Sequence, residues 1–115
     1  MYVAELDGEV VGFVSGGQIR EPLQEYDAEL FAIYLLQRAQ GLGIGTALLR
    51  KLADSLRAKG FKSMAVWVLE SNPSIHFYEK LGALPVSAKE IEIGGALLSE
   101  LALAWPDLGM IVASL

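Results

Sequence analysis

The sequence predicts an α/β fold built on one mixed, mostly antiparallel sheet. A strand–helix–strand segment over residues 28–69 has the length of a parallel β-α-β unit with a right-handed crossover. On either side of it, apolar segments around Asp7-Gly8 and Gly94-Gly95 predict β-hairpins, whose strands are antiparallel. We find no internal repeat or linker in the 115 residues, so a single domain over residues 1–115 is expected.

The composition excludes several classes of protein. Apolar residues make up 53% of the chain, but no apolar run approaches the ~18 residues of a membrane helix. A net charge of −5 argues against a nucleic-acid surface. With no cysteine and one histidine, neither a thiolate nor a histidine metal cluster can form, so no metal is expected. The chain begins without a signal-peptide pattern, and we expect a cytoplasmic protein.

The first elements are a hairpin and a buried strand. Residues 1–6 and 10–16 are predicted strands around the Asp7-Gly8 turn, and residues 18–27 form a polar loop. Residues 28–36 are apolar at nearly every position, as in a parallel strand buried on both faces. Because the chain starts inside a strand, that strand would be an exposed edge. A homodimer that covers this edge is therefore expected.

A glycine-rich turn and a helix follow. Glycines at positions 41, 43 and 45 alternate with apolar residues and run into a 3.6-residue apolar stripe that predicts a helix over 44–59. A strand, a glycine turn and a helix together present free backbone N–H groups, which form a site for an anion such as phosphate. The alternative is a tight turn that only needs positive φ angles. The glycines match neither the dinucleotide fingerprint nor the P-loop.

The second half of the chain is predicted as strand, helix and hairpin. Residues 64–69 form an apolar strand parallel to 28–36. Asn72 then serves as the N-cap of a short helix with Pro73 at its first position, ending at Gly82. The second hairpin pairs residues 89–93 with 96–104. No element is predicted for residues 107–115.

Two motifs in this order carry a family resemblance. The first is Gln40-x-x-Gly43-x-Gly45 followed by Thr46-Ala47-Leu48-Leu49. The second is the strand end Trp67-Val68-Leu69-Glu70 followed by Asn72-Pro73-Ser74-Ile75-His76-Phe77-Tyr78-Glu79-Lys80-Leu81-Gly82. Together they resemble the GNAT superfamily of acetyl-CoA-dependent N-acetyltransferases, strongly over residues 29–82. The resemblance implies a sheet whose central parallel strands splay apart, with two packed helices. The family's usual first strand and the helices after it are absent, so the fold is expected to be N-terminally shortened.

The resemblance also implies how acetyl-CoA would bind. Backbone N–H groups from Gly41 to Thr46 would hold the pyrophosphate, residues 33–35 would pair with the pantetheine arm, and an N–H near Leu35 would polarise the thioester carbonyl. Asn72 either contacts the cofactor or acts only as an N-cap. The expected cofactor-binding residues are Ile33, Tyr34, Leu35, Gln40, Gly41, Leu42, Gly43, Ile44, Gly45, Thr46 and Asn72. Candidate partners of the 3′-phosphate are Arg38, Arg50 and Lys51, unless they are ordinary surface residues.

Two residues are expected to be catalytic by the same resemblance. Tyr78 would give a proton to the departing thiolate, although its place in the apolar arc of the helix also fits a core tyrosine. Glu29 would take the proton of the amine, with a pKa that burial can raise. The alternatives are that Glu29 is a surface acid and that a chain of water molecules carries this proton. His76 lies on the polar side of the helix and is predicted to be a surface residue.

The resemblance implies an N-acetyltransferase that moves an acetyl group from acetyl-CoA to a primary amine by direct attack, without a covalent intermediate. The acceptor would be a small molecule or a peptide. Two alternatives stay open: a module that binds acyl-CoA without turnover, and a different nucleotide binder on a Rossmann-like sheet.

Overall fold

Six strands form one mixed sheet in the computed structural model, which describes residues 1–113. The strands are β1 (Tyr2–Leu6), β2 (Glu9–Gln18), β3 (Ala28–Leu35), β4 (Met64–Leu69), β5 (Leu84–Ile93) and β6 (Ala96–Trp105). Their order in the sheet is β1-β2-β3-β4-β6-β5, and every neighbouring pair is antiparallel except β3 and β4. The predicted mixed sheet with a central parallel pair is confirmed.

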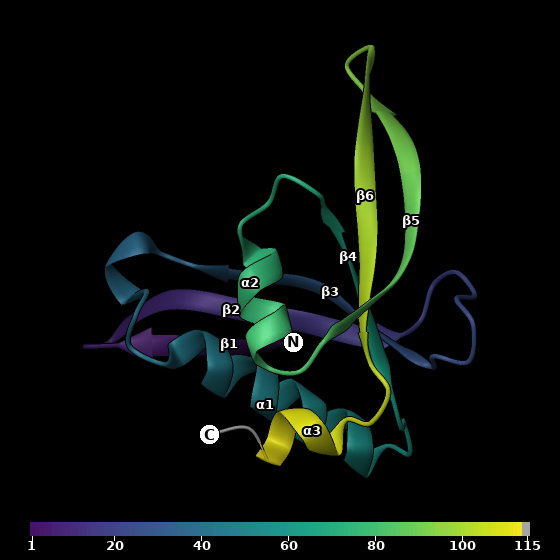
Figure 1. Cartoon of the computed structure of the whole chain (residues 1–115). Coiled ribbons are helices and arrows are strands. Elements are labelled where there is room, and N and C mark those ends of the chain that lie inside the picture. Colours follow the sequence, from purple (N-terminus) through teal and green to yellow (C-terminus); the bar gives the residue numbers. More distant parts are fainter. Residues whose placement is uncertain (114–115) are drawn as a thin grey trace.

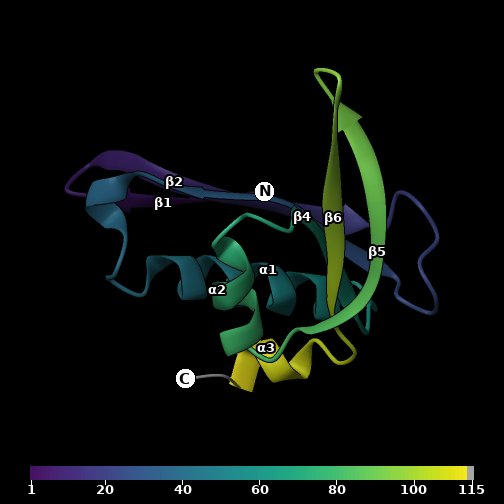
Figure 2. The ribbon, with the colours of Figure 1, turned by 45° about the horizontal axis from the view of Figure 1, so that its top comes forward.

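The helices gather on one face of this sheet. They are α1 (Ile44–Ala58), α2 (Ser74–Lys80) and α3 (Gly109–Ala113), and the 3₁₀ turn η1 (Gln37–Ala39) precedes α1. Figure 1 and Figure 2 both show α1 running beneath β1 to β3, with α2 beside it. No helix in residues 1–113 combines the length and apolar character needed to cross a membrane.

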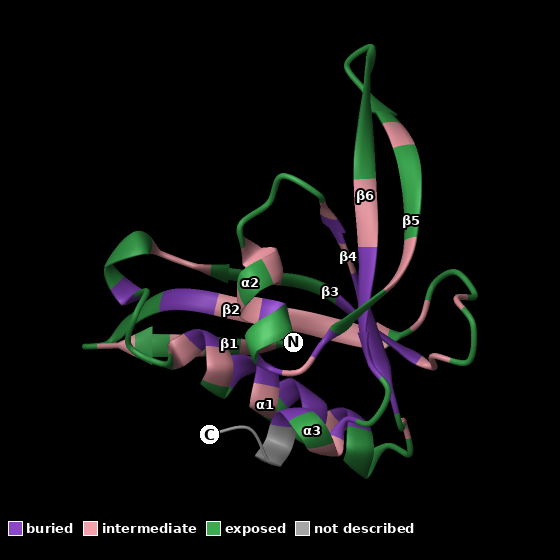
Figure 3. Ribbon diagram, viewed as in Figure 1, coloured by how far each residue is buried: buried purple, intermediate pink, exposed green. Residues whose placement is uncertain are grey.

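The core lies between this face and the helices. The apolar stripe of α1, with Leu48, Leu49 and Leu52, faces β1, β2 and β3 and belongs to one buried cluster with residues of β2, β3, β4 and β6. The core ends where the β5–β6 hairpin leaves the other elements: Figure 3 shows its outer half exposed, and Leu97 is 70% exposed. The buried contacts are thus concentrated where α1 and α2 meet the central strands.

The parallel strands β3 and β4 are joined only at one end. They pair at Ala28 with Met64 and at Glu29 with Ala65, and then diverge. The Asp27 carboxylate ties this end together, because it accepts hydrogen bonds from the backbone N–H of Ser63 (2.9 Å), that of Lys62 (3.0 Å) and the Ser63 hydroxyl (2.9 Å). We call Asp27, Lys62 and Ser63 the strand clamp. Beyond it, a gap opens between the central strands.

Two element predictions needed correction. β5 begins at Leu84 rather than at residue 89, because a bulge between Pro85 and Ser87 breaks the alternation that marks a strand. Residues 109–113 form α3, which no pattern predicted because the helix is short and held by tertiary packing: Leu108 and Ile111 are fully buried. Residues 114 and 115, for which no element was predicted, lie outside the described part of the chain.

Candidate functional site

A groove of about 640 Å³ opens between β3, the glycine turn and α2. It lies where the sheet is incomplete, alongside the gap between β3 and β4. Its lining residues are Ile33, Tyr34, Leu35, Gln40, Gly41, Gly43, Gly45, Thr46, Pro73, Ser74, Phe77 and Lys80. Segments far apart in the sequence thus meet at one site, and eight of the predicted cofactor-binding residues are among them.

The backbone of β3 presents hydrogen-bonding groups to the gap. The Leu36 N–H donates to the Val11 carbonyl (2.8 Å), which makes Gly12 and Leu35 a non-hydrogen-bonded pair of the antiparallel ladder. The Leu35 N–H therefore turns away from β2 and toward the gap. The backbone N–H of Ile33 also points toward the gap, because the direction of backbone N–H groups alternates from one residue to the next along a strand. The N–H groups of Ile33 and Leu35 thus lie on the edge of β3 that borders the gap, where an extended ligand could pair.

The glycine turn presents the N-terminus of α1 to the same groove. Gly41 and Gly43 both have φ of +79°, which an L side chain adopts only under strain, so the requirement for positive φ is confirmed. Among the described residues no side chain caps the helix, and its first turn holds no acidic residue. The first backbone N–H groups of α1 are thus left without intrahelical partners, as in an anion site.

One face of α2 forms the opposite wall. Ser74, Phe77 and Lys80 recur at helical spacing and line the groove, together with Pro73. The wall lies beside Gly45: an added Cβ there would make an ordinary 3.5 Å contact with the Phe77 ring and a tighter 3.3 Å contact with Leu35 of β3. Sequence reasoning missed this wall, although the i, i+3 spacing within the second motif was a signal for it.

Three predicted cofactor-binding residues lie outside the groove lining. Leu42 points outward and is 61% exposed, and Ile44 is partly buried against the core. Asn72 lies just before α2, and its side-chain oxygen accepts the Ser74 backbone N–H at 2.8 Å. The N-cap position of α2 is nevertheless Pro73, and the helix starts at Ser74, so the N-cap predicted at Asn72 is shifted by one residue.

Tyr78 lies beside the groove but is a core residue. It is 6% exposed, its ring meets Trp105 edge-on at 5.8 Å between ring centroids, and it contacts the groove-lining Phe77 at 5.5 Å. Burial raises the pKa of the phenol. Within residues 1–113, no hydrogen bond holds the Tyr78 hydroxyl. The neighbouring His76 is exposed, as predicted, and faces Glu79 at 3.9 Å.

Glu29 lies on the opposite face of the sheet, where the gap begins. Its neighbours Ala28 and Leu30 belong to the core, so the Glu29 side chain points the other way. A cleft of about 300 Å³ on that face is lined by Glu29 and by Arg20, Glu21, Trp67, Lys89 and Glu100. In it, Arg20 Nη2 lies 2.7 Å from Glu29 Oε2, while the Arg20 backbone N–H and Nε donate to Oε1.

The expected direction of the Glu29 pKa shift was wrong. Burial by itself raises the pKa of this carboxyl, but the hydrogen bonds and the positive charge of Arg20 outweigh burial and bring the pKa below its usual value. Glu29 is therefore ionised at neutral pH and paired. The loop that carries Arg20 was predicted only as polar, and no pattern in it indicated this partner.

The cations expected to meet a 3′-phosphate lie elsewhere. Arg38 pairs with Glu9 at 2.5 Å, and Lys51 lies over the Tyr2 ring, 5.7 Å from its centroid. Arg50 is half-buried. None of the three is among the groove-lining residues of the described chain.

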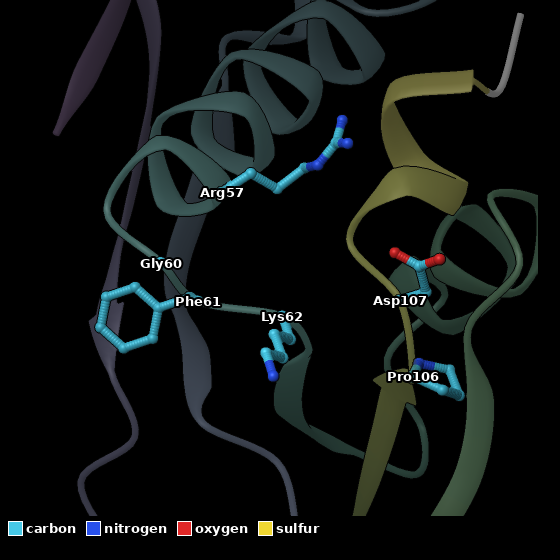
Figure 4. A pocket seen from close by; sticks show the side chains of 6 residues that line it. All are labelled: Arg57, Gly60, Phe61, Lys62, Pro106 and Asp107. Carbon is cyan, nitrogen blue, oxygen red and sulfur yellow. The ribbon is translucent and has the colours of Figure 1, made fainter.

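A further cleft of about 530 Å³ lies at the C-terminal end of α1. It is lined by Arg57, Gly60, Phe61, Lys62, Pro106 and Asp107. Figure 4 shows that these side chains do not converge, since Phe61 points away from Arg57. The groove beside the glycine turn is the better candidate, because it joins an open strand edge to a helix N-terminus.

Comparison with known proteins assigns the family. The model of the acetyltransferase (GNAT) family matches residues 1–83. The chain belongs to this family. It is 50% identical over 101 residues to an uncharacterized N-acetyltransferase of Bacillus subtilis (strain 168), YuaI, covering 88% of this chain and 58% of the relative. It is 38% identical to the phosphinothricin N-acetyltransferase of Streptomyces viridochromogenes, covering 70% of this chain and 44% of that protein.

Solved GNAT structures share the fold. An N-acetyltransferase from Staphylococcus aureus Mu50 superposes with a TM-score of 0.77 at 28% identity, over 92% of this chain and 66% of the other. The yncA protein of Salmonella typhimurium, solved with its cofactor acetyl-CoA, gives a TM-score of 0.75 at 26% identity, over 90% of this chain and 62% of the other. The chain spans about half the length of the curated relatives named above.

Proposed function

We propose that this GNAT chain binds acetyl-CoA in the groove and transfers its acetyl group to a primary amine by direct attack. The observation that carries the proposal is the meeting, in one groove, of the open β3 edge and the uncapped N-terminus of α1. The first suits an amide-bearing arm that pairs like a strand, and the second suits a pyrophosphate. The groove of about 640 Å³ is of the size of ordinary cofactor sites.

The open space at the glycine turn further supports coenzyme A as the ligand. A Cβ added at Gly41 or Gly43 would meet no atom within 4 Å, so the space above this backbone is open to a phosphate. Acetyl-CoA, when bound, supplies an activated acetyl thioester. The Leu35 N–H then donates a hydrogen bond to the thioester carbonyl, where negative charge develops during transfer.

Two protons have to move when the N–C bond forms and the C–S bond breaks. In this proposal Glu29 takes the proton of the amine, which enters through the gap from the face that carries Glu29 and Trp67. Tyr78 gives a proton to the departing thiolate. The raised pKa of Tyr78 keeps the phenol protonated at neutral pH, and its hydroxyl has no partner within residues 1–113.

The first test is calorimetry with acetyl-CoA, paired with a colorimetric assay of coenzyme A release over a panel of amines. Gly43→Ala is expected to weaken acetyl-CoA binding by about tenfold, because the strained turn would displace the N–H groups (~1–3 kcal/mol). Gly8→Ala is the matched control, since Gly8 has φ of +82° and equally open space but lies in the β1–β2 turn. Equal losses of affinity in both variants would contradict the site.

The second test addresses Tyr78. Tyr78→Phe keeps the ring contacts with Phe77 and Trp105 and removes only the hydroxyl. We expect kcat to fall about 10²-fold, the lower end for a lost general acid, with acetyl-CoA affinity retained. Unchanged turnover would remove Tyr78 from the mechanism.

A second candidate function is binding of acyl-CoA without turnover. It is favoured by one observation: neither Glu29 nor Tyr78 lines the groove, and Glu29 is held by Arg20. Binding of acetyl-CoA with no release of coenzyme A across the amine panel would establish it. The proposal includes a small-molecule or peptide acceptor and a homodimer that covers the outer edge of β1. The expected cytoplasmic location stays a prediction.

A further inference from the structure

Lys80 stands out because it is the single positive side chain in the lining of the groove, as far as residues 1–113 show. It lies in the last turn of α2, three residues after Phe77, and is exposed. No ion pair with a described residue holds its ammonium group, while its neighbour Glu79 faces His76. The Lys80 charge is thus available to a ligand.

The charge balance makes such a residue important. The chain has a net charge of −5, and coenzyme A carries three phosphate groups. The net negative charge of the chain therefore repels coenzyme A at long range. Hydrogen-bond donors and positive charges at the binding site have to offset this repulsion. The cations expected for this task, Arg38 and Lys51, contact Glu9 and Tyr2 instead.

The other residues of the groove indicate which phosphate Lys80 meets. Lys80 lines the same groove as Gly41, Gly43 and Thr46 of the glycine turn, where the pyrophosphate is proposed to bind. The backbone N–H groups of the turn already serve the pyrophosphate, whereas the phosphate on the ribose needs a side chain.

We propose that Lys80 binds the 3′-phosphate of coenzyme A and is the specificity residue of this chain for coenzyme A over its 3′-dephospho form. This inference rests on the proposed function, since it takes the groove as the acetyl-CoA site. It also predicts a salt dependence, because an exposed charge pair is screened as ionic strength rises.

The test is calorimetry with coenzyme A and with 3′-dephospho-coenzyme A. At low ionic strength Lys80→Met is expected to bind coenzyme A about fivefold more weakly than wild type, the upper range for an exposed ion pair. The two proteins should bind 3′-dephospho-coenzyme A equally, and the difference for coenzyme A should shrink at high ionic strength. Lys59→Met makes the same charge change at the far end of α1 and should behave as wild type.

The outcomes separate this inference from the proposed function. Equal losses with both ligands, or the same loss in Lys59→Met, would overturn the assignment to the 3′-phosphate. So would unchanged affinity in Lys80→Met. Failure of wild type to bind either ligand would instead contradict the acetyl-CoA site itself.

Discussion

At the scale of single residues, the Arg20–Glu29 ion pair sets the charge state of the carboxylate at the start of the gap. In Arg20→Met the hydrogen bonds and charge of Arg20 that lower the Glu29 pKa are lost, while burial and the weaker effect of the Lys89 charge remain, so this pKa rises. If Glu29 accepts the amine proton, the acid limb of the kcat/KM profile moves to higher pH. Arg38→Met, which breaks the exposed pair with Glu9, should leave the limb in place. An unmoved limb in Arg20→Met would exclude Glu29 as the base.

Residue-scale predictions from sequence worked where the motif itself fixes the backbone. The positive φ of Gly41 and Gly43 depends on neighbours within a few positions, as does the hydrogen bond from Ser74 to Asn72. The pKa of Glu29 depends on Arg20, whose guanidinium reaches Glu29 through the fold of an irregular loop. A local pattern carries no information about such a contact, and the pKa direction was therefore wrong.

At the scale of elements, the packing of β2 on β3 depends on adjacent glycines that differ sharply in available space. A Cβ at Gly16 would lie 2.8 Å from the Glu29 carbonyl oxygen, whereas a Cβ at Gly17 would make an ordinary 3.5 Å contact with Phe31. We expect Gly16→Ala to lower the free energy of unfolding by ~1–3 kcal/mol, since the backbone must shift. Gly17→Ala should stay within about 0.5 kcal/mol. Urea denaturation measures both, and equal effects would contradict the packing described.

The strand clamp gives a second prediction for elements. Burial would raise the Asp27 pKa, but the hydrogen bonds from Ser63 and Lys62 outweigh it and lower this pKa. The ionised form therefore stabilises the fold above the unfolded pKa of about 3.9, and this contribution is lost as pH falls through the folded value. Asp27→Asn is expected to cost ~1–2 kcal/mol at neutral pH. The difference in free energy of unfolding between wild type and Asp27→Asn should become smaller below about pH 4. A difference that does not change with pH would mean that the carboxylate charge is not involved.

At the scale of the whole molecule, the strands of the sheet could be predicted from the sequence better than the packing of the helices around it. The β-α-β unit over residues 28–69 and the two hairpins could be predicted because each uses local connections, whereas the pairing of β6 with β4 joins distant segments and was not predicted. α3 and the α2 wall of the groove were not predicted. Both are defined by packing between distant segments, such as Leu108 and Ile111 in the core or Phe77 beside Gly45. The part of the site proposed to bind acetyl-CoA could be predicted from the two motifs. The part proposed to receive the amine depends on tertiary contacts.

The outer edge of the sheet leads to the last prediction. β1 pairs only with β2 in the described chain, so its other edge leaves backbone groups unpaired, and Val3 is 52% exposed. Such an edge is a template for another strand, and we expect two copies to pair through it. A lysine at Val3 should block this pairing and give the mass of one chain in light scattering. Val10→Lys is the matched control, because Val10 is equally exposed at 57% but lies on the interior strand β2. A single-chain mass for wild type over a range of concentrations would show that β1 is protected in another way, whereas a dimer that survives Val3→Lys would place the interface elsewhere.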